Sequence, residues 1–423
     1  MRTTLTRVAG AAAACLLAAA CTGTTSTGDS DTASDGKQSL RYLIEQQEDA
    51  NTLEPLRKHI DEWSAESGIE VKVETLPLEA MRTVLQTQLR SGDGPDVFAW
   101  GSGPSFGGAL AEAGLVKDLT AAYEEHDWQV YDFAKERVTV DGKVYGIPGE
   151  AETIGLFYNK EIFSELGLEE PQSLEDVEAA SEAARKAGVT PMAVGDKEGW
   201  EGGHLLSMAL SSAIGSDGME ALLNGERKWN SPEVVEALSL WKGFDEKGYL
   251  PESPTSVDYD TSTSLFYSGK AAMIPTGSWL VAEIEDNADF EVGYVPFPSS
   301  DGPGIFTGGL GSGPYVSANT DNEDAALEFM DFLASEEHAQ WVVENLATIP
   351  PRELDTQGLD VSPLFEQVLQ DTAELSGSGD FGLNIDVLAT DAFNEAMWDG
   401  VQGVLTGQRT PEQVAQSLEA ARA

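Results

Sequence analysis

The chain has 423 residues, of which 41% are hydrophobic and 23% charged, a composition typical of a globular protein long enough for two domains. Its 73 Asp and Glu residues outnumber 25 Lys and Arg, and the net charge of −48 at pH 7 argues against nucleic acid and anionic lipid headgroups as partners. Both cysteines lie within the first 21 residues, so no disulfide is expected in the folded body, and four scattered histidines predict no metal site and no cofactor.

The N-terminus predicts export. Two arginines precede an apolar run over residues 8–20, which is too short for a permanent membrane span and is typical of a signal peptide, here assigned to residues 1–20. Cys21 follows Leu-Ala-Ala-Ala, which resembles a bacterial lipobox except that Ala18 stands where a larger aliphatic residue is usual. The resemblance implies a diacylglyceryl anchor on Cys21. Plain secretion with an incidental cysteine is the alternative. Residues 21–37, rich in Gly, Ser, Thr and Asp, predict a lipidated tether.

Alternating strand and helix patterns follow the tether. Residues 40–45, 69–73 and 96–100 predict strands, and apolar residues recur at helical spacing between them. This β-α-β-α-β order predicts an open, largely parallel sheet, whose ligands sit off the carboxyl ends of the strands. The segments after the first and third strands are therefore expected to face a ligand, which makes Gln46 and Trp100 candidates.

A second set of elements follows. Asp141-Gly142 between two short apolar runs predicts a hairpin. Asn159 and Ser173 are expected to cap helices, and Ser231-Pro232 to begin another. Further strands are predicted at residues 154–158, 190–194 and 271–274, and no internal repeat is found.

Five segments together resemble the extracellular solute-binding proteins of carbohydrate ABC importers, of which the maltose-binding type is the best known. The segments are residues 94–100, 144–160, 268–279, 329–335 and 405–412. The resemblance implies an α/β fold, a two-lobed periplasmic-binding-protein-like clamshell with discontinuous lobes joined by crossover segments. Lobe one would comprise residues 38–150 plus 293–348, and lobe two residues 151–292 plus 349–423.

Sugar recognition requires aromatic faces for the ring and carboxylates, amides or Arg for the hydroxyls. The resemblance implies stacking by Trp100 and Trp279, hydroxyl binding by Glu152, and an aromatic contact from Trp200 in a Gly-rich loop over residues 197–204. The alternatives are core packing for the tryptophans and a solvated surface acid for Glu152.

Further candidates lie beside these. Seven more residues are expected to contact the ligand because of where they lie, for example in a crossing segment, in the Gly-rich loop or on a helix that lines the cleft. An ion pair on the surface is the alternative for the arginine, and the two helix residues differ from the maltose-binding pattern. The residues are Glu150, Glu201, His204, Gly309, Arg352, Asn394 and Trp398.

The resemblance implies a monomeric, lipid-anchored protein on the extracellular face of the cell membrane, which captures a mono- or oligosaccharide, delivers it to an ABC permease and performs no chemistry. No P-loop is present, so ATP hydrolysis is expected from another subunit. One alternative is a polyamine or other cationic solute, held by Glu152, Glu201 and the tryptophans. Another is a secreted glycoside hydrolase, for which 73 acids offer too many candidate pairs to be informative.

Overall fold

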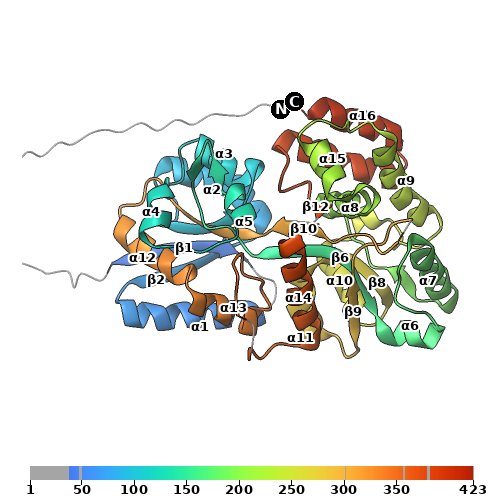
Figure 1. The fold of residues 1–423 in the computed structure, drawn as a ribbon, viewed down its shortest axis with the longest axis horizontal. Helices are drawn as coiled ribbons and strands as arrows, with labels where there is room; N and C mark the ends of the chain where they lie inside the picture. Colours follow the sequence, from blue (N-terminus) through green and yellow to red (C-terminus); the bar gives the residue numbers. More distant parts are fainter. Residues whose placement is uncertain (1–37, 47–49, 301, 356–357, 379–381, 423) are drawn as a thin grey trace, which may run out of the picture. The chain divides into compact units, whose positions relative to one another are not determined.

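The computed structural model describes residues 38–46, 50–300, 302–355, 358–378 and 382–422. The predicted signal peptide, tether and Cys21 lie outside this range. From Gln38 onward the chain forms one compact unit, whose described residues include two large sheets (Figure 1) and a separate two-stranded one. In the part of the chain that the structure describes, no helix has the length and apolar character that crossing a bilayer requires.

The first sheet has the strand order β11-β3-β1-β2. Strand β1 pairs in parallel with β2 and β3, as the β-α-β pattern predicts, and β11 pairs antiparallel with β3. The core beneath it includes Leu40, Phe98 and Phe329, all fully buried. The bounds are β1 Ser39–Glu45, β2 Glu70–Leu76, β3 Val97–Gly101 and β11 Ser312–Val316.

The second sheet is built around β6, which is buried along nearly its whole length. Strand β6 pairs antiparallel with β8, β9 and β10, while β7 and β12 extend the sheet in parallel to β8 and β10. The predicted hairpin at Asp141-Gly142 forms β4 and β5. The bounds are β4 Thr139–Val140, β5 Lys143–Val144, β6 Ala151–Asn159, β7 Thr190–Met192, β8 Ala271–Gly277, β9 Val292–Val295, β10 Thr307–Leu310 and β12 Gly382–Leu383.

Helices pack against both sheets (Figure 1). The predicted caps are confirmed: Asn159 accepts a hydrogen bond from the Ile162 N–H at 3.0 Å, and Ser173 accepts one from the Asp176 N–H at 3.2 Å. The α-helices are α1 Ala50–Ser67, α2 Leu78–Ser91, α3 Ala109–Glu112, α4 Thr120–Glu125, α5 Asp132–Arg137, α6 Lys160–Leu166, α7 Leu174–Ala187, α8 Trp200–Leu223, α9 Pro232–Glu246, α10 Tyr259–Tyr267, α11 Val281–Asn287, α12 Glu323–Leu333, α13 Glu336–Leu346, α14 Pro363–Ser378, α15 Asp391–Leu405 and α16 Pro411–Ala421. Short turns of other helix types are η1 Pro104–Gly108, η2 Pro254–Ser256 and η3 Ser278–Leu280.

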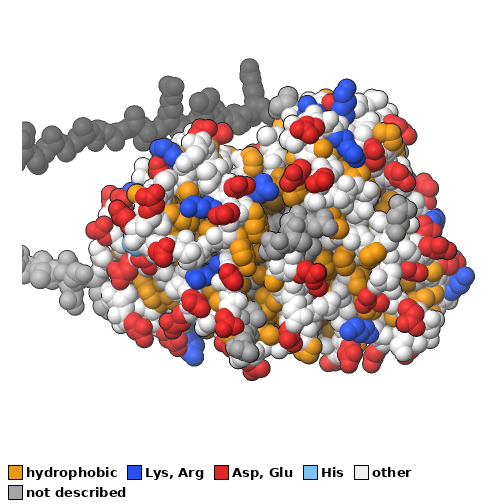
Figure 2. Space-filling view, viewed as in Figure 1, with side chains coloured by type: hydrophobic (Ala, Val, Ile, Leu, Met, Phe, Trp, Pro, Cys, Tyr) orange, Lys and Arg blue, Asp and Glu red, His pale blue; other side chains and the backbone are white. Residues whose placement is uncertain are grey.

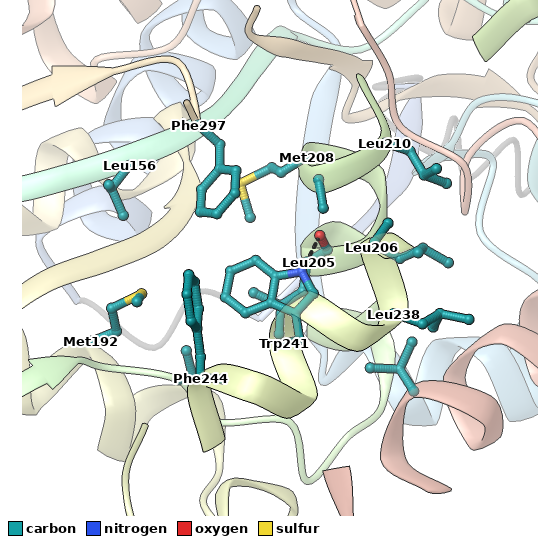
Figure 3. Packing of buried hydrophobic residues seen from close by; sticks show 14 of the residues in the cluster. Leu156, Met192, Leu205, Leu206, Met208, Leu210, Leu238, Trp241, Phe244 and Phe297 are labelled. Carbon is teal, nitrogen blue, oxygen red and sulfur yellow. Dashed lines mark hydrogen bonds between the residues drawn. The ribbon is translucent and has the colours of Figure 1, made fainter. Parts of the chain in front are cut away.

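Helix α8 runs through the core of the second-sheet region. Trp241 of α9 packs beside it among aliphatic and aromatic side chains, and its indole N–H donates to the Leu205 carbonyl at 2.7 Å (Figure 3). Burying a tryptophan is favourable when its N–H finds an acceptor in this way. The rest of that neighbourhood is apolar, with Phe244 and Phe297 both almost fully buried.

The chain passes between the two sheets at two neighbouring points. It enters the second sheet at Ala151, the first residue of β6, and leaves it at Gly311, between β10 and β11. The second of these points lies in the predicted return crossing at Gly308–Gly311. The predicted lobes change at residue 293, whereas β9 and β10 both pair with β6, so residues 292–295 and 307–310 lie in the second sheet. The division into lobes otherwise stays a prediction.

Candidate functional site

In the Gly-rich segment predicted as a loop over residues 197–204, residues 197–199 lie outside any helix, but residues 200–204 are the start of α8. The N–H of Gly202 donates to a carboxylate oxygen of Asp196 at 2.7 Å, and an acid in this position stabilises the start of a helix. The glycines allow close packing against α15, since a Cβ on Gly203 would lie 2.9 Å from Met397. Close packing, which the sequence pattern does not show, explains why the loop prediction is wrong for residues 200–204.

Four ring side chains come together beside the start of α8, and we call them the aromatic cluster: Trp200, His204, Tyr259 and Trp279. The His204 ring centroid lies 5.1 Å from that of Trp200 and 5.4 Å from that of Trp279. The indole N–H of Trp279 donates to the Tyr259 hydroxyl at 2.8 Å. His204 is buried, whereas the other three rings are half-buried and keep part of their surface accessible.

Three carboxylates lie at the crossing, and we call them the three-acid cluster: Glu150, Glu152 and Asp386. A Cβ on Gly311 would collide with the Glu150 carboxyl and lie 2.6 Å from Glu152 Oε1, so both acids reach over the same glycine. Burial, together with the charge of Glu45, raises the pKa of Glu150 to about 7. Burial, followed by the charges of Glu150 and Asp386, raises the pKa of Glu152 well above its ordinary value.

His204 joins the aromatic cluster to the three-acid cluster. Its Nε2 lies 3.3 Å from Asp386 Oδ2 and 3.3 Å from Asn384 Nδ2. A Cβ on Gly309 would lie 3.5 Å from both Asn384 Cβ and Glu152 Oε2, so these two side chains flank that glycine. Buried polar atoms normally find a partner. Several here have none among the described residues: Glu201 Oε2, His204 Nδ1, Asp386 Oδ1 and Asn394 Oδ1.

A cavity of about 300 Å³ lies beside the crossing, a volume at the lower end of the range of small-molecule sites. Phe133 and Arg137 of α5 and Glu152 and Gly309 of the crossing all line the cavity. Burial lowers the pKa of Arg137. The full lining is Ser102, Phe133, Glu136, Arg137, Ala151, Glu152, Glu220, Gly308, Gly309, Leu310, Gly382, Leu383, Val387 and Leu388.

Helix α15 supports the site. Asn394 is buried and donates from Nδ2 to the Asp386 carbonyl at 2.6 Å, which positions the segment that carries Asp386. Trp398 packs on α8, where a Cβ on Gly203 would lie 3.1 Å from its Nε1. The guanidinium carbon of Arg82, from α2 in the first-sheet region, lies 5.5 Å from the Trp398 ring centroid. Trp398 therefore lies where the two regions meet.

Three predicted site residues lie apart from these clusters. Trp100 is only 7% exposed and packs in the first-sheet core, with its ring centroid 5.7 Å from that of Phe106. Gln46 is exposed and its N–H donates to the Leu76 carbonyl. Arg352 donates to the Ala334 carbonyl at 2.9 Å, and no ion pair of it is found among the described residues. Their roles in binding stay predictions.

Sequence reasoning missed several residues of the site. Asn384 and Asp386 are buried polar residues in the irregular segment and turn that follow β12, and no local signal in the sequence marked them. Tyr259 and Arg82 lie far from the aromatic residues in sequence and gave no local signal. Within the described ranges, no three His, Cys, Asp or Glu side chains are arranged to hold a metal ion.

Comparisons with known proteins agree with this fold. The family described as bacterial extracellular solute-binding protein matches residues 49–340. A maltotriose-binding protein of Pyrococcus abyssi is 25% identical over 84% of this chain and 74% of its own length. A multiple sugar-binding protein of Streptococcus mutans is 27% identical over 71% of each chain.

Solved structures show the same fold. A chitin oligosaccharide binding protein has a TM-score of 0.78 at 25% identity, over 90% of this chain and 98% of that one. A protein described with xylan utilization by Caldanaerobius polysaccharolyticus has a TM-score of 0.81 at 23% identity, over 90% and 99%. The predicted α/β periplasmic-binding-protein fold is confirmed, here with two mixed sheets.

Proposed function

Because this chain belongs to the bacterial extracellular solute-binding proteins, a non-catalytic family, we propose that it binds a saccharide beside the crossing and delivers it to the membrane subunits of an ABC importer. The family membership also sets aside the glycoside hydrolase alternative. The observation that carries the saccharide class is the aromatic cluster, with half-buried rings next to buried polar atoms that lack partners.

A sugar ring presents an apolar C–H face and a rim of hydroxyls, and the two clusters match these two features. Trp200 and Trp279 offer the aromatic faces. Glu152 and Asp386 offer acceptors for hydroxyl hydrogens, and Asn384 offers an amide with both a donor and an acceptor. The names of the similar proteins, which bind maltotriose, multiple sugars and chitin oligosaccharide, support the same ligand class.

The crossing positions these groups for closure around the ligand. Ser102 of the first-sheet region donates at 3.4 Å to the carbonyl of Gly311, the glycine over which the acids reach. Small rotations at two adjacent crossings move whole regions, which is the usual hinge of proteins that close on a ligand. We expect the radius of gyration in small-angle scattering to fall when saturating ligand is added. An unchanged radius would contradict a hinge.

Lipidation of Cys21 is the finer part of the proposal, supported by the lipobox-like sequence. Replacing Cys21 with Ser is expected to move the protein from the membrane fraction to the medium. Two acyl chains are needed for stable anchoring, so loss of the predicted diacylglyceryl group suffices. Continued membrane association of the Ser variant would contradict the anchor.

The proposed ligand class is tested with the purified full-length protein and a panel of neutral saccharides of one to four units. Ligand binding to the folded state raises the melting temperature by mass action, so at least one saccharide is expected to do so and to give saturable heat in calorimetry. A shift produced by solutes of another class, with none from any saccharide, would overturn the proposal.

A further inference from the structure

We infer that the saccharide carries a basic nitrogen, as an amino sugar does, and that the three-acid cluster of Glu150, Glu152 and Asp386 receives it. This inference rests on the proposed function and narrows it to a chemical class of saccharide. It starts from the convergence of acids that come from two separate parts of the chain.

Two of these acids lie on the crossing into β6 and the third follows β12. Glu150 and Glu152 both reach over Gly311, and Glu152 also flanks Gly309 opposite Asn384. Asp386 lies two residues beyond Asn384, and its charge acts on Glu152. The sheet thus brings three carboxyl groups to one place beside the cavity that Glu152 lines.

Asp386 supplies an independent sign of a missing partner. Its side chain belongs to a residue that is 7% exposed, and its Oδ1 has no hydrogen-bond partner among the described residues. Its Oδ2 lies 3.3 Å from His204 Nε2, so the unpartnered oxygen is the one left for a ligand. Glu201 is 3% exposed, and its Oε2 likewise has no hydrogen-bond partner among the described residues. Burial, followed by the charges of Asp196 and Asp386, raises the pKa of Glu201 well above its ordinary value.

No fixed cation of the protein neutralises this cluster. Among the described residues, no Lys or Arg nitrogen lies within the ion-pair distance of 4.0 Å from a carboxylate oxygen of Glu150, Glu152 or Asp386. Arg137 lines the same cavity, but the acids that act on it are Glu136 and Glu220. Buried charges are normally paired, because desolvation of an unpaired carboxylate is costly.

A neutral hydroxyl donates a hydrogen bond to a carboxylate but does not neutralise its charge. An ammonium group donates hydrogen bonds and also neutralises the charge. The raised pKa values of Glu150 and Glu152 agree with a site that lacks positive charge in the absence of ligand. Asp and Glu side chains are also spread over the face seen in Figure 2, so the field around the molecule favours the approach of a cation. Trp200 and Trp279 lie nearby, and their aromatic faces are suited to stacking against a sugar ring. An amino sugar has such a ring and a free polyamine does not, so the two tryptophans favour the amino sugar.

The test compares three compounds that differ only at one carbon: glucosamine, N-acetylglucosamine and glucose, each also as the β-1,4-linked dimer. Calorimetry at pH 6.5, with the amine protonated, is expected to show at least tenfold tighter binding of the amine. Spermidine and putrescine are measured in parallel.

Substitutions of the acids test whether the three-acid cluster causes the preference for the amine. Glu152→Gln and Asp386→Asn are expected to reduce the preference for the amine at least tenfold, with smaller changes for glucose. Glu150→Gln serves in the same way if Asp386→Asn does not fold. The control is Glu165→Gln, an exposed acid on α6 outside both the cavity and the cluster, which is expected to keep the preference.

The outcomes separate the inference from the proposed function. No preference for the amine over its acetylated and hydroxyl counterparts, at either size, would overturn the inference, and tight binding of the neutral sugars would then leave the proposed function standing. Binding of spermidine or putrescine without binding of any saccharide would overturn the proposed function itself.

Discussion

Two buried regions beside α8 are completed in different ways. Leu205 accepts the indole N–H of Trp241 in an otherwise apolar core (Figure 3), whereas the adjacent residue, His204, keeps Nδ1 without a partner. Around Trp241 the protein supplies every contact that the side chain needs. Around His204 it leaves several buried polar atoms open, next to rings that are only half-buried.

The difference indicates that residues of one helix serve two purposes: those beside Trp241 stabilise the fold, and those beside His204 are available for ligand binding. A buried polar atom without a partner costs free energy, so a fold retains such atoms only where another molecule or water completes them. Substitutions on the Trp241 side are therefore expected to change the free energy of unfolding, and substitutions on the His204 side to change ligand affinity. Substitution and titration experiments test this difference between the two regions, beginning with the largest expected effect.

The largest effect is expected from Trp241→Ala. Removing a nearly fully buried tryptophan leaves a cavity, and the free energy of unfolding is expected to fall by about 3–5 kcal/mol. Denaturant unfolding measures this loss, and calorimetry at low temperature measures the affinity of the folded fraction, which is expected to stay unchanged. Affinity lost together with stability would show that the two sides of α8 are not independent.

The next effect concerns pH and Glu150. Burial raises the pKa of Glu150 to about 7 from an ordinary value of 4.5, so between these pH values the folded protein holds more protons than the unfolded chain. This stabilising contribution is complete below pH 4.5 and is lost as pH rises through 7. At pH 8, Glu150→Gln is expected to raise the free energy of unfolding of the ligand-free protein, by up to about 3 kcal/mol.

Denaturant unfolding from pH 4.5 to pH 8 tests this expectation. The exposed Glu136 provides the matched control, and Glu136→Gln is expected to leave the pH profile unchanged. A Glu150→Gln variant with the same slope as the wild type would contradict a raised pKa for Glu150.

Trp279→Ala provides the direct counterpart of Trp241→Ala. Loss of a stacked aromatic face is expected to cost about 1–3 kcal/mol of binding free energy, or roughly a ten- to hundredfold loss of affinity. Calorimetry with the best saccharide of the panel measures it. Trp63→Ala, which removes a partly buried tryptophan of the first-sheet region, is the control and is expected to keep the affinity. Normal affinity in a destabilised Trp279→Ala variant would show that Trp279 is a core residue and does not stack on the ligand.

The smallest effect is expected from Arg82→Met. The guanidinium faces the Trp398 ring across the two regions, and such a cation–π contact contributes about 0.5–1 kcal/mol. Affinity is therefore expected to fall roughly two- to fivefold, because the contact stabilises the arrangement in which the regions meet. Unchanged affinity would show that this contact plays no part in closure.

Sequence patterns predicted most of the elements because their signals are local. The apolar spacing in α1 and α2 and the caps at Asn159 and Ser173 depend on neighbours a few residues away. The start of α8 was missed because its glycines are explained by contact with α15, nearly two hundred residues later in the sequence (Met397 beside Gly203).

The site was harder to predict than the fold, as two tryptophans illustrate. Trp100 and Trp279 both end or follow a strand, and the resemblance gives both the same role. The structure buries Trp100 against Phe106 in the first-sheet core, whereas Trp279 joins His204 and Tyr259. Contacts between distant segments decide such cases, and the spacing of apolar residues contains no information about them. The same holds for Asp386, which reaches Glu152 only through the arrangement of β12 and β10.

Gly311 links the path of the chain to the charge of the site, with a consequence for how relatives of this protein diverge. Any side chain there would meet the carboxyls of Glu150 and Glu152 and would displace these side-chain ends from their present positions. Substitution of Gly311 by Ala should shift Glu150 most, because its carboxyl lies nearest, which makes the two positions candidates for correlated change between homologues. Engineers who wish to alter ligand preference at this site would have to vary both positions in the same library.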